Sequence, residues 1–155
     1  MKSEDALKRF SSSRQALFEA IAGLSDAELT GPKVEGVWTI KDLLGHISAW
    51  EQKLLVPLAS FAIGGTFKAE VVYNHDAWNL NQSTRRSSWT CAEIIKEIET
   101  TRQEVLDLLN KLSANQWGQS ILTPWGEENT IAEMISGLAW HEEDHTKSIL
   151  KYLSQ

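Results

Sequence analysis

The sequence lacks several features that are typical of secreted, membrane-spanning or nucleic-acid-binding proteins, and each absence argues against one of these classes. Cys91 is the only cysteine, so no internal disulfide can form, and a reducing cytoplasm is the expected location. No stretch approaches the roughly 18 apolar residues of a membrane-spanning helix. The opening "MKSEDALKRF" mixes acids with bases and leads into no long apolar run, unlike a secretory signal. A soluble protein without a membrane partner is therefore expected.

Basic residues are also scarce. The sequence has 15 Lys and Arg against 21 Asp and Glu, which gives a formal net charge of −6. The only basic cluster is Arg85-Arg86. Proteins that bind nucleic acids contact the phosphate backbone with clusters of Lys and Arg. No nucleic-acid partner is therefore expected, and the Arg pair is interpreted as a solvated face. A chain of 155 residues with 23% charged residues is typical of one globular domain, here residues 1–155.

What the sequence does have is a helical period. Apolar residues recur at three- and four-residue spacing in four long segments, which predicts an all-α fold. Three of the segments open with a Thr and an acid three residues later, the capping-box pattern: these pairs are Thr39 with Asp42, Thr90 with Glu93, and Thr130 with Glu133. The second segment should run to Gly64, with Pro57 bending it, and the third to about Leu112. No alternating run predicts a strand.

The connections 64–89 and 113–129 are long for a simple bundle. Within the first, "HDAWNLNQSTRRS" can form a short extra helix. Long crossovers in a four-helix bundle indicate that its helices are not arranged up-down-up-down.

The candidate functional residues cluster in "HEEDH", residues 141–145, on the fourth helix. At 100° per residue, His141, Glu142 and His145 all fall inside the apolar stripe of that helix, where ionisable groups are expensive unless something pairs with them. Imidazoles four residues apart point the same way and can share one divalent ion.

A metal site needs a further ligand from elsewhere in the chain. His46 lies at the edge of the second helix's apolar stripe, whereas His75 lies in the crossover next to Asp76 and is expected to face solvent. We therefore predict a centre formed by His46, His141 and His145, which leaves positions open for water or substrate, as in catalytic sites. The alternative is that these histidines are hydrogen-bonded packing residues.

The letters of "HEEDH" also match the H-E-x-x-H pattern of zinc proteases. Such a protease takes its third ligand downstream, but no His, Asp or Glu follows His145. It also needs a sheet to hold the substrate, and none is predicted. The protease interpretation is rejected.

Two segments carry a resemblance to a known family. "VWTIKDLLGHISAWEQ" resembles the second-helix signature of the DinB-like/YfiT-like superfamily, and "IAEMISGLAWHEEDHTKSILKYL" resembles its closing helix. The "AWE" after the first histidine and "DAWNLNQ" are more similar to the ClbS/DfsB branch. The resemblance implies a four-helix bundle ordered up-down-down-up, with the long crossover between its second and third helices. It also implies a divalent metal, zinc or nickel, held by His46, His141 and His145.

Several other residues are candidates for the site. Glu142 is a candidate catalytic base, with pairing to Arg14 of the first helix as the favoured alternative. Trp50, Asn79, Asn81 and Arg14 are assigned to a substrate pocket, although Trp50 can equally be core filler. Trp140 points away from the apolar stripe, so we expect the crossover or a second subunit to cover it.

These features lead to competing functional hypotheses. The first is a metal-dependent hydrolase or thiol-dependent transferase that acts on a small electrophilic molecule. As the resemblance implies, the transferase would use a low-molecular-weight thiol. The second is a non-catalytic protein that binds and sequesters a small molecule. The third is a structural homodimer.

Overall fold

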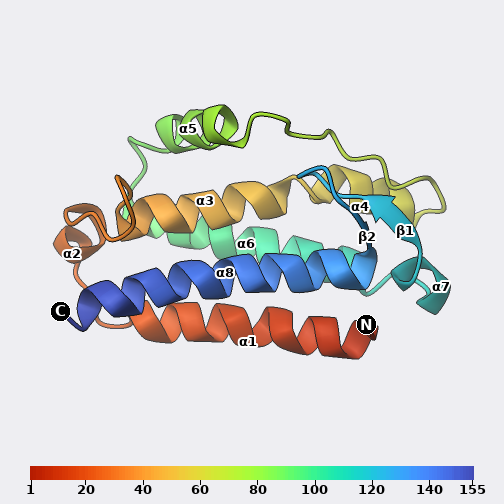
Figure 1. Ribbon diagram of the computed structural model, residues 1–155, viewed down its shortest axis with the longest axis horizontal. Helices are drawn as coiled ribbons and strands as arrows, with labels where there is room; N and C mark the ends of the chain where they lie inside the picture. Colours follow the sequence, from red (N-terminus) through yellow and green to blue (C-terminus); the bar gives the residue numbers. More distant parts are fainter.

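The computed structural model describes all 155 residues as a bundle of four long helical segments with short elements at its ends (Figure 1). In chain order the elements are α1 (Ser3–Ile21), α2 (Asp26–Thr30), α3 (Ile40–Gln52), α4 (Leu55–Ala62), α5 (His75–Arg85), α6 (Cys91–Leu109), α7 (Ala114–Trp117), β1 (Ser120–Leu122), β2 (Glu128–Thr130) and α8 (Ile131–Leu153). None of the helices has the length and apolarity that crossing a membrane requires.

The order of the helices is up-down-down-up, as predicted. In Figure 1, α1 and α8 run side by side in one direction, while α3 and α6 run together in the other. Parallel neighbours cannot be joined by a tight turn, so the chain returns from α4 to the start of α6 through the crossover that carries α5. The all-α prediction and the extra helix in the crossover are confirmed.

The predicted helix starts are confirmed because their signals are local. Thr39 and Thr130 each accept a hydrogen bond from the backbone three residues on, and Asp42 and Glu133 reach back to complete a capping box. Thr90 accepts the equivalent bond from the nitrogen of Glu93. Each cap satisfies N–H groups that the first helical turn leaves free.

Some predicted boundaries are wrong. The second segment breaks at residues 53–54, because Pro57 has no N–H to give to the carbonyl four residues earlier. The third ends at Leu109, three residues early. The connection after α7 contains a short antiparallel hairpin, β1 with β2, in the register Ser120 to Thr130. Strands of three residues are too brief to show an alternating pattern.

A polar layer divides the bundle core about halfway along its length. On one side lies an apolar cluster that includes Phe10 and Leu138, and on the other a cluster that includes Leu17 and Ile149. Between them, each of the four long helices contributes one buried charged residue, which together form what we call the ionic quartet: Arg14, Glu51, Arg102 and Glu142.

The crossover is held at both ends. Arg86 is buried and donates from Nε to Glu97 Oε1 at 2.8 Å, so the prediction that the Arg85-Arg86 pair forms a solvated face is wrong for this residue. At the other end, the nitrogen of Val72 donates to the carbonyl of Pro124 in the hairpin. These anchors place α5 beside α3, over the histidine-bearing part of that helix.

Candidate metal centre

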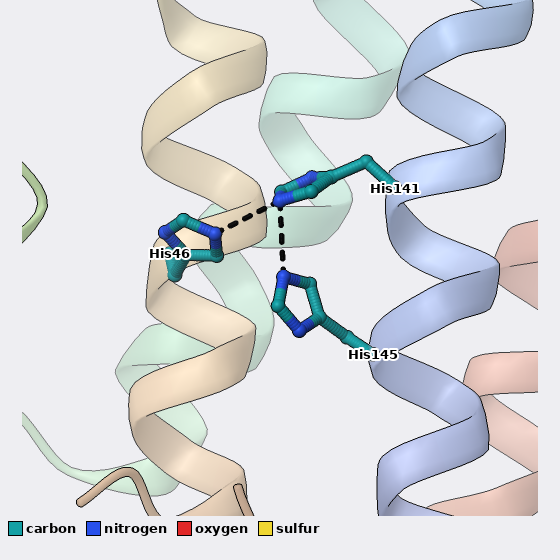
Figure 2. A group of neighbouring side chains, drawn as sticks. All are labelled: His46, His141 and His145. Atoms are coloured by element: carbon teal, nitrogen blue, oxygen red, sulfur yellow. Dashed lines mark hydrogen bonds between the residues drawn. The ribbon is translucent and has the colours of Figure 1, made fainter. Parts of the chain in front are cut away.

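The three predicted histidines meet between α3 and α8 (Figure 2). Their Nε2 atoms converge: that of His141 lies 2.9 Å from that of His46 and 3.0 Å from that of His145. We call these residues the histidine triad. His141 and His145 are brought together by one helical turn of α8, and His46 reaches them from α3.

This arrangement fits a divalent metal. Three ring nitrogens, one from each histidine, lie within 4.8 Å of one another. Two imidazole nitrogens that share a tetrahedral zinc at about 2.05 Å are themselves about 3.3 Å apart, so small adjustments suffice. With one proton per neutral ring, three converging nitrogens cannot all be satisfied by hydrogen bonds to one another. A cation at their meeting point would satisfy all of the lone pairs.

Burial keeps His46 and His141 neutral. Desolvation, followed by the charges of His141 and His145, lowers the pKa of His46 from 6.5 to about 2. Desolvation and then His145 lower the pKa of His141 to about 4. Neutral imidazole is the form that binds metal, so both rings are ready to do so at pH 7.

Glu35 orients the third ring, a role that the sequence analysis missed. Its Oε1 lies 3.0 Å from Nδ1 of His145, which places the proton on Nδ1 and leaves Nε2 free to face the other two histidines. Carboxylates that hold a histidine in this way are the usual outer partners of metal ligands. Glu35 lies in the turn before α3, 110 residues from His145, and no spacing rule links the two.

A cavity of about 400 Å³ opens onto the triad. Its wall includes all three histidines and the predicted pocket residues Trp50 and Asn79. Trp50 donates from Nε1 to Oδ1 of Asn79 at 3.0 Å, which ties α5 to α3 at the cavity edge. His75 also lines the cavity but lies outside the triad.

The predicted catalytic role of Glu142 is not supported by the structure. Its carboxylate is fully buried, accepts from Nε of Arg14 at 2.6 Å and from Oγ of Ser13 at 2.6 Å, and does not line the cavity. The alternative, a pair with Arg14, is what the structure shows. A carboxylate held in the core by three donors, Ser13, Arg14 and Arg102, cannot take a proton from a molecule at the triad.

Two further pocket expectations, for Arg14 and Asn81, are wrong. Arg14 is buried in the ionic quartet and does not reach the cavity. Asn81 is exposed and lies outside the cavity wall, because it is two residues from Asn79 and points to another side of α5. Trp140 is 56% exposed at the cavity edge, so the crossover does not cover it, and cover by a second subunit stays a prediction.

Comparison with known proteins identifies the superfamily to which this chain belongs. The model of the DinB superfamily matches residues 9–149, most of the chain, and the protein therefore belongs to that superfamily. A protein of Oceanobacillus iheyensis named "Putative metal-dependent hydrolase" is 27% identical over 148 residues, which cover 96% of this chain and 83% of its own.

Two solved structures show the same fold at low sequence identity. The mycothiol-dependent maleylpyruvate isomerase has a TM-score of 0.80 at 15% identity, over 96% of this chain and 61% of its own. The colibactin self-resistance protein ClbS, in complex with a double-stranded DNA, has a TM-score of 0.79 at 14% identity, over 99% and 96%. Likeness at this level shows the fold and leaves the activity of this chain open.

Proposed function

We propose that the protein is a metal-dependent hydrolase that acts on a small electrophilic molecule bound in the cavity beside the histidine triad. The observation that carries the proposal is the convergence of three histidine Nε2 atoms, at 2.9 and 3.0 Å, on the wall of an open cavity. A structural metal site would be closed by a fourth protein ligand, whereas this one faces a cavity.

The chain's own residues would divide the work. The triad would hold the metal, which the family resemblance suggests is zinc or nickel, and such an ion, when bound, lowers the pKa of water or of a thiol toward neutrality. Glu35 fixes the ring of His145, and the Trp50–Asn79 hydrogen bond fixes the cavity edge beside His46. The substrate would bind against the indole rings of the cavity wall, where water is partly excluded.

A thiol-dependent transferase is the second candidate. It is favoured by a second hollow, which reaches His46 and His145 from the side of Glu35 and Trp38. Two approaches to one triad would suit two substrates, one of them a low-molecular-weight thiol. The fold shared with a mycothiol-dependent isomerase agrees with this candidate.

The test is turnover of a panel of small electrophiles, such as activated esters, lactones and epoxides, by protein supplied with zinc or nickel. The hydrolase predicts turnover that a chelator removes, that zinc or nickel restores, and that His141→Ala abolishes. A requirement for added thiol would favour the transferase. Turnover unchanged by chelation and by His141→Ala would refute both, and metal-free binding without turnover would favour a sequestering protein.

A further inference from the structure

The cavity beside the triad carries a charge pattern that the proposed function does not use. Its wall contains two carboxylates, Glu127 and Asp144, and neither lysine nor arginine. Neither carboxylate takes part in an ion pair within the chain. Elsewhere in the molecule, cations are available to acids: Glu97, for example, is paired with Arg86 and Glu143 with Arg9. In the metal-free protein, no lysine or arginine of the cavity wall therefore balances these two negative charges.

Each carboxylate stands beside a tryptophan on the same wall. On α8, Trp140 and Asp144 are four residues apart and are therefore neighbours on the helix surface. On the hairpin, Trp125 and Glu127 flank Gly126, whose φ of 93° forms the tight turn that brings both to the cavity. The turn is fixed because the nitrogen of Thr123 donates to the carbonyl of Glu127 at 2.8 Å.

Two separate elements, α8 and the hairpin, thus each present one indole and one carboxylate to the cavity. Trp50 of α3 adds a third indole. Indole faces attract cations through the ring quadrupole, and they recognise alkylammonium groups in particular. A carboxylate beside each ring adds a charge of the sign that such a ligand needs. In the metal-free protein, an anionic ligand would find no lysine or arginine on this wall.

We propose that the cavity selects organic cations, so that the substrate is a small electrophile bearing an alkylammonium or amidinium group next to an apolar portion. This inference rests on the proposed function in that it names the substrate class of the same site. The cationic group would lie between the α8 wall and the hairpin wall, while the apolar portion packs against Trp50 and Leu138.

Three probes of similar shape test the selection: benzyltrimethylammonium, benzyl methyl sulfone and benzylsulfonate, which are cationic, neutral and anionic. None has an amine lone pair with which to bind a metal. Their affinities are measured by quenching of tryptophan fluorescence, with the full chain free of metal and again loaded with zinc. We expect the cation to bind about tenfold more tightly than the sulfone, from cation–π and carboxylate attraction together, and the sulfonate to bind most weakly in the metal-free protein.

Matched variants locate the effect. The double substitution Glu127→Gln with Asp144→Asn should reduce the preference for the cation to about twofold, which is what the indole faces alone retain. Glu99→Gln removes the same kind of charge from an exposed position on α6 away from the cavity, and it should change nothing. Circular dichroism checks that all variants fold, which is expected because both replaced carboxylates are exposed and unpaired.

The inference is overturned if the three probes bind equally, if the sulfonate binds best to metal-free protein, if none binds, or if the double variant keeps the full preference. These outcomes are separate from those of the proposed function. A protein that holds zinc but shows no preference for the cation refutes the substrate class alone. A protein that prefers the cation but holds no metal refutes the hydrolase, and the cation is then a bound ligand.

Discussion

Two buried polar groups lie next to each other in this bundle, and they are built in opposite ways. In the ionic quartet, two arginines face two glutamates: Arg14 contacts Glu51 and Glu142 at 2.6 Å each, and Arg102 contacts Glu51 at 2.7 Å. Each remaining guanidinium nitrogen is hydrogen-bonded as well, since Arg14 also donates to the carbonyl of Ile98 and Arg102 to that of Phe10. The quartet is therefore neutral in sum and complete in its hydrogen bonds.

The histidine triad is less deeply buried, with His141 half-buried at the cavity, and its hydrogen bonds are not complete. Its three Nε2 atoms face one another, and only His145 has a carboxylate partner. The only buried side-chain polar atom without any hydrogen-bond partner is Oγ of Ser48, so the core as a whole is well satisfied. Against that background, the comparison teaches that the quartet serves the fold, while the triad is arranged for a ligand that supplies positive charge.

The largest expected effect comes from breaking the quartet. Arg102→Met leaves the carboxylate of Glu51 buried with half of its partners, which should lower the free energy of unfolding by about 3–5 kcal/mol. Urea denaturation measures this loss. The control is Arg9→Met, which removes a partly exposed pair with Glu143 and should cost less than about 1 kcal/mol. Equal costs for the two variants would contradict the structural role of the quartet.

The triad should respond to metal where the quartet does not. Zinc at a hundred times its dissociation constant should stabilise the protein by about 2.7 kcal/mol, because binding favours the folded state. Thermal denaturation with and without zinc measures the shift. His141→Ala should abolish it, and His75→Ala, which changes a cavity histidine outside the triad, should retain it. The same shift in both variants would place the zinc elsewhere.

The metal-free protein should become less stable as the pH falls from about 6.5 toward 4. His46 and His141 have pKa values lowered to about 2 and about 4, so in this range the unfolded chain binds more protons than the folded one. At pH 6 the loss should be about 1 kcal/mol for each histidine. Urea denaturation across this pH range measures the loss of free energy of unfolding. In His46→Ala, the part of the loss that His46 contributes should be absent. Stability that does not change with pH in the wild-type protein would contradict the lowered pKa values of His46 and His141.

The smallest effect should come from Glu35. Glu35→Gln keeps the size of the side chain but weakens its hold on His145, so zinc affinity should fall about tenfold, at the low end for such partners because the carboxylate is partly exposed. Competition with a chromophoric chelator measures the affinity. Glu128→Gln, an exposed acid on β2, is the control. If the two variants bind zinc equally well, Glu35 does not position the ring.

The sequence predicted the parts of this protein that depend on short-range patterns. The starts of α3, α6 and α8 follow from caps within four residues, and His141 with His145 follows from the pitch of one helix. Partners that meet only through the fold could not be found in this way. Glu35 is one, and the hairpin that brings Trp125 to the cavity is another.

Glu142 shows where helical periodicity stops being informative. Its place near the centre of the α8 stripe correctly predicted burial. The adjacent His141, 100° around the helix, faces α3 and the cavity, while Glu142 faces α1 and the quartet. An apolar stripe is wide enough to contact two neighbouring helices, so burial alone does not say which one a polar residue meets.

The central claim is that the histidine triad holds a metal ion, and the most direct test is the metal content of the purified protein. Elemental analysis after supply with zinc or nickel should find about one ion per chain in the wild type and in His75→Ala, and none in His46→Ala. Protein that carries no stoichiometric metal would contradict the claim. Metal that stays bound in His46→Ala would show that the ligands have been assigned wrongly.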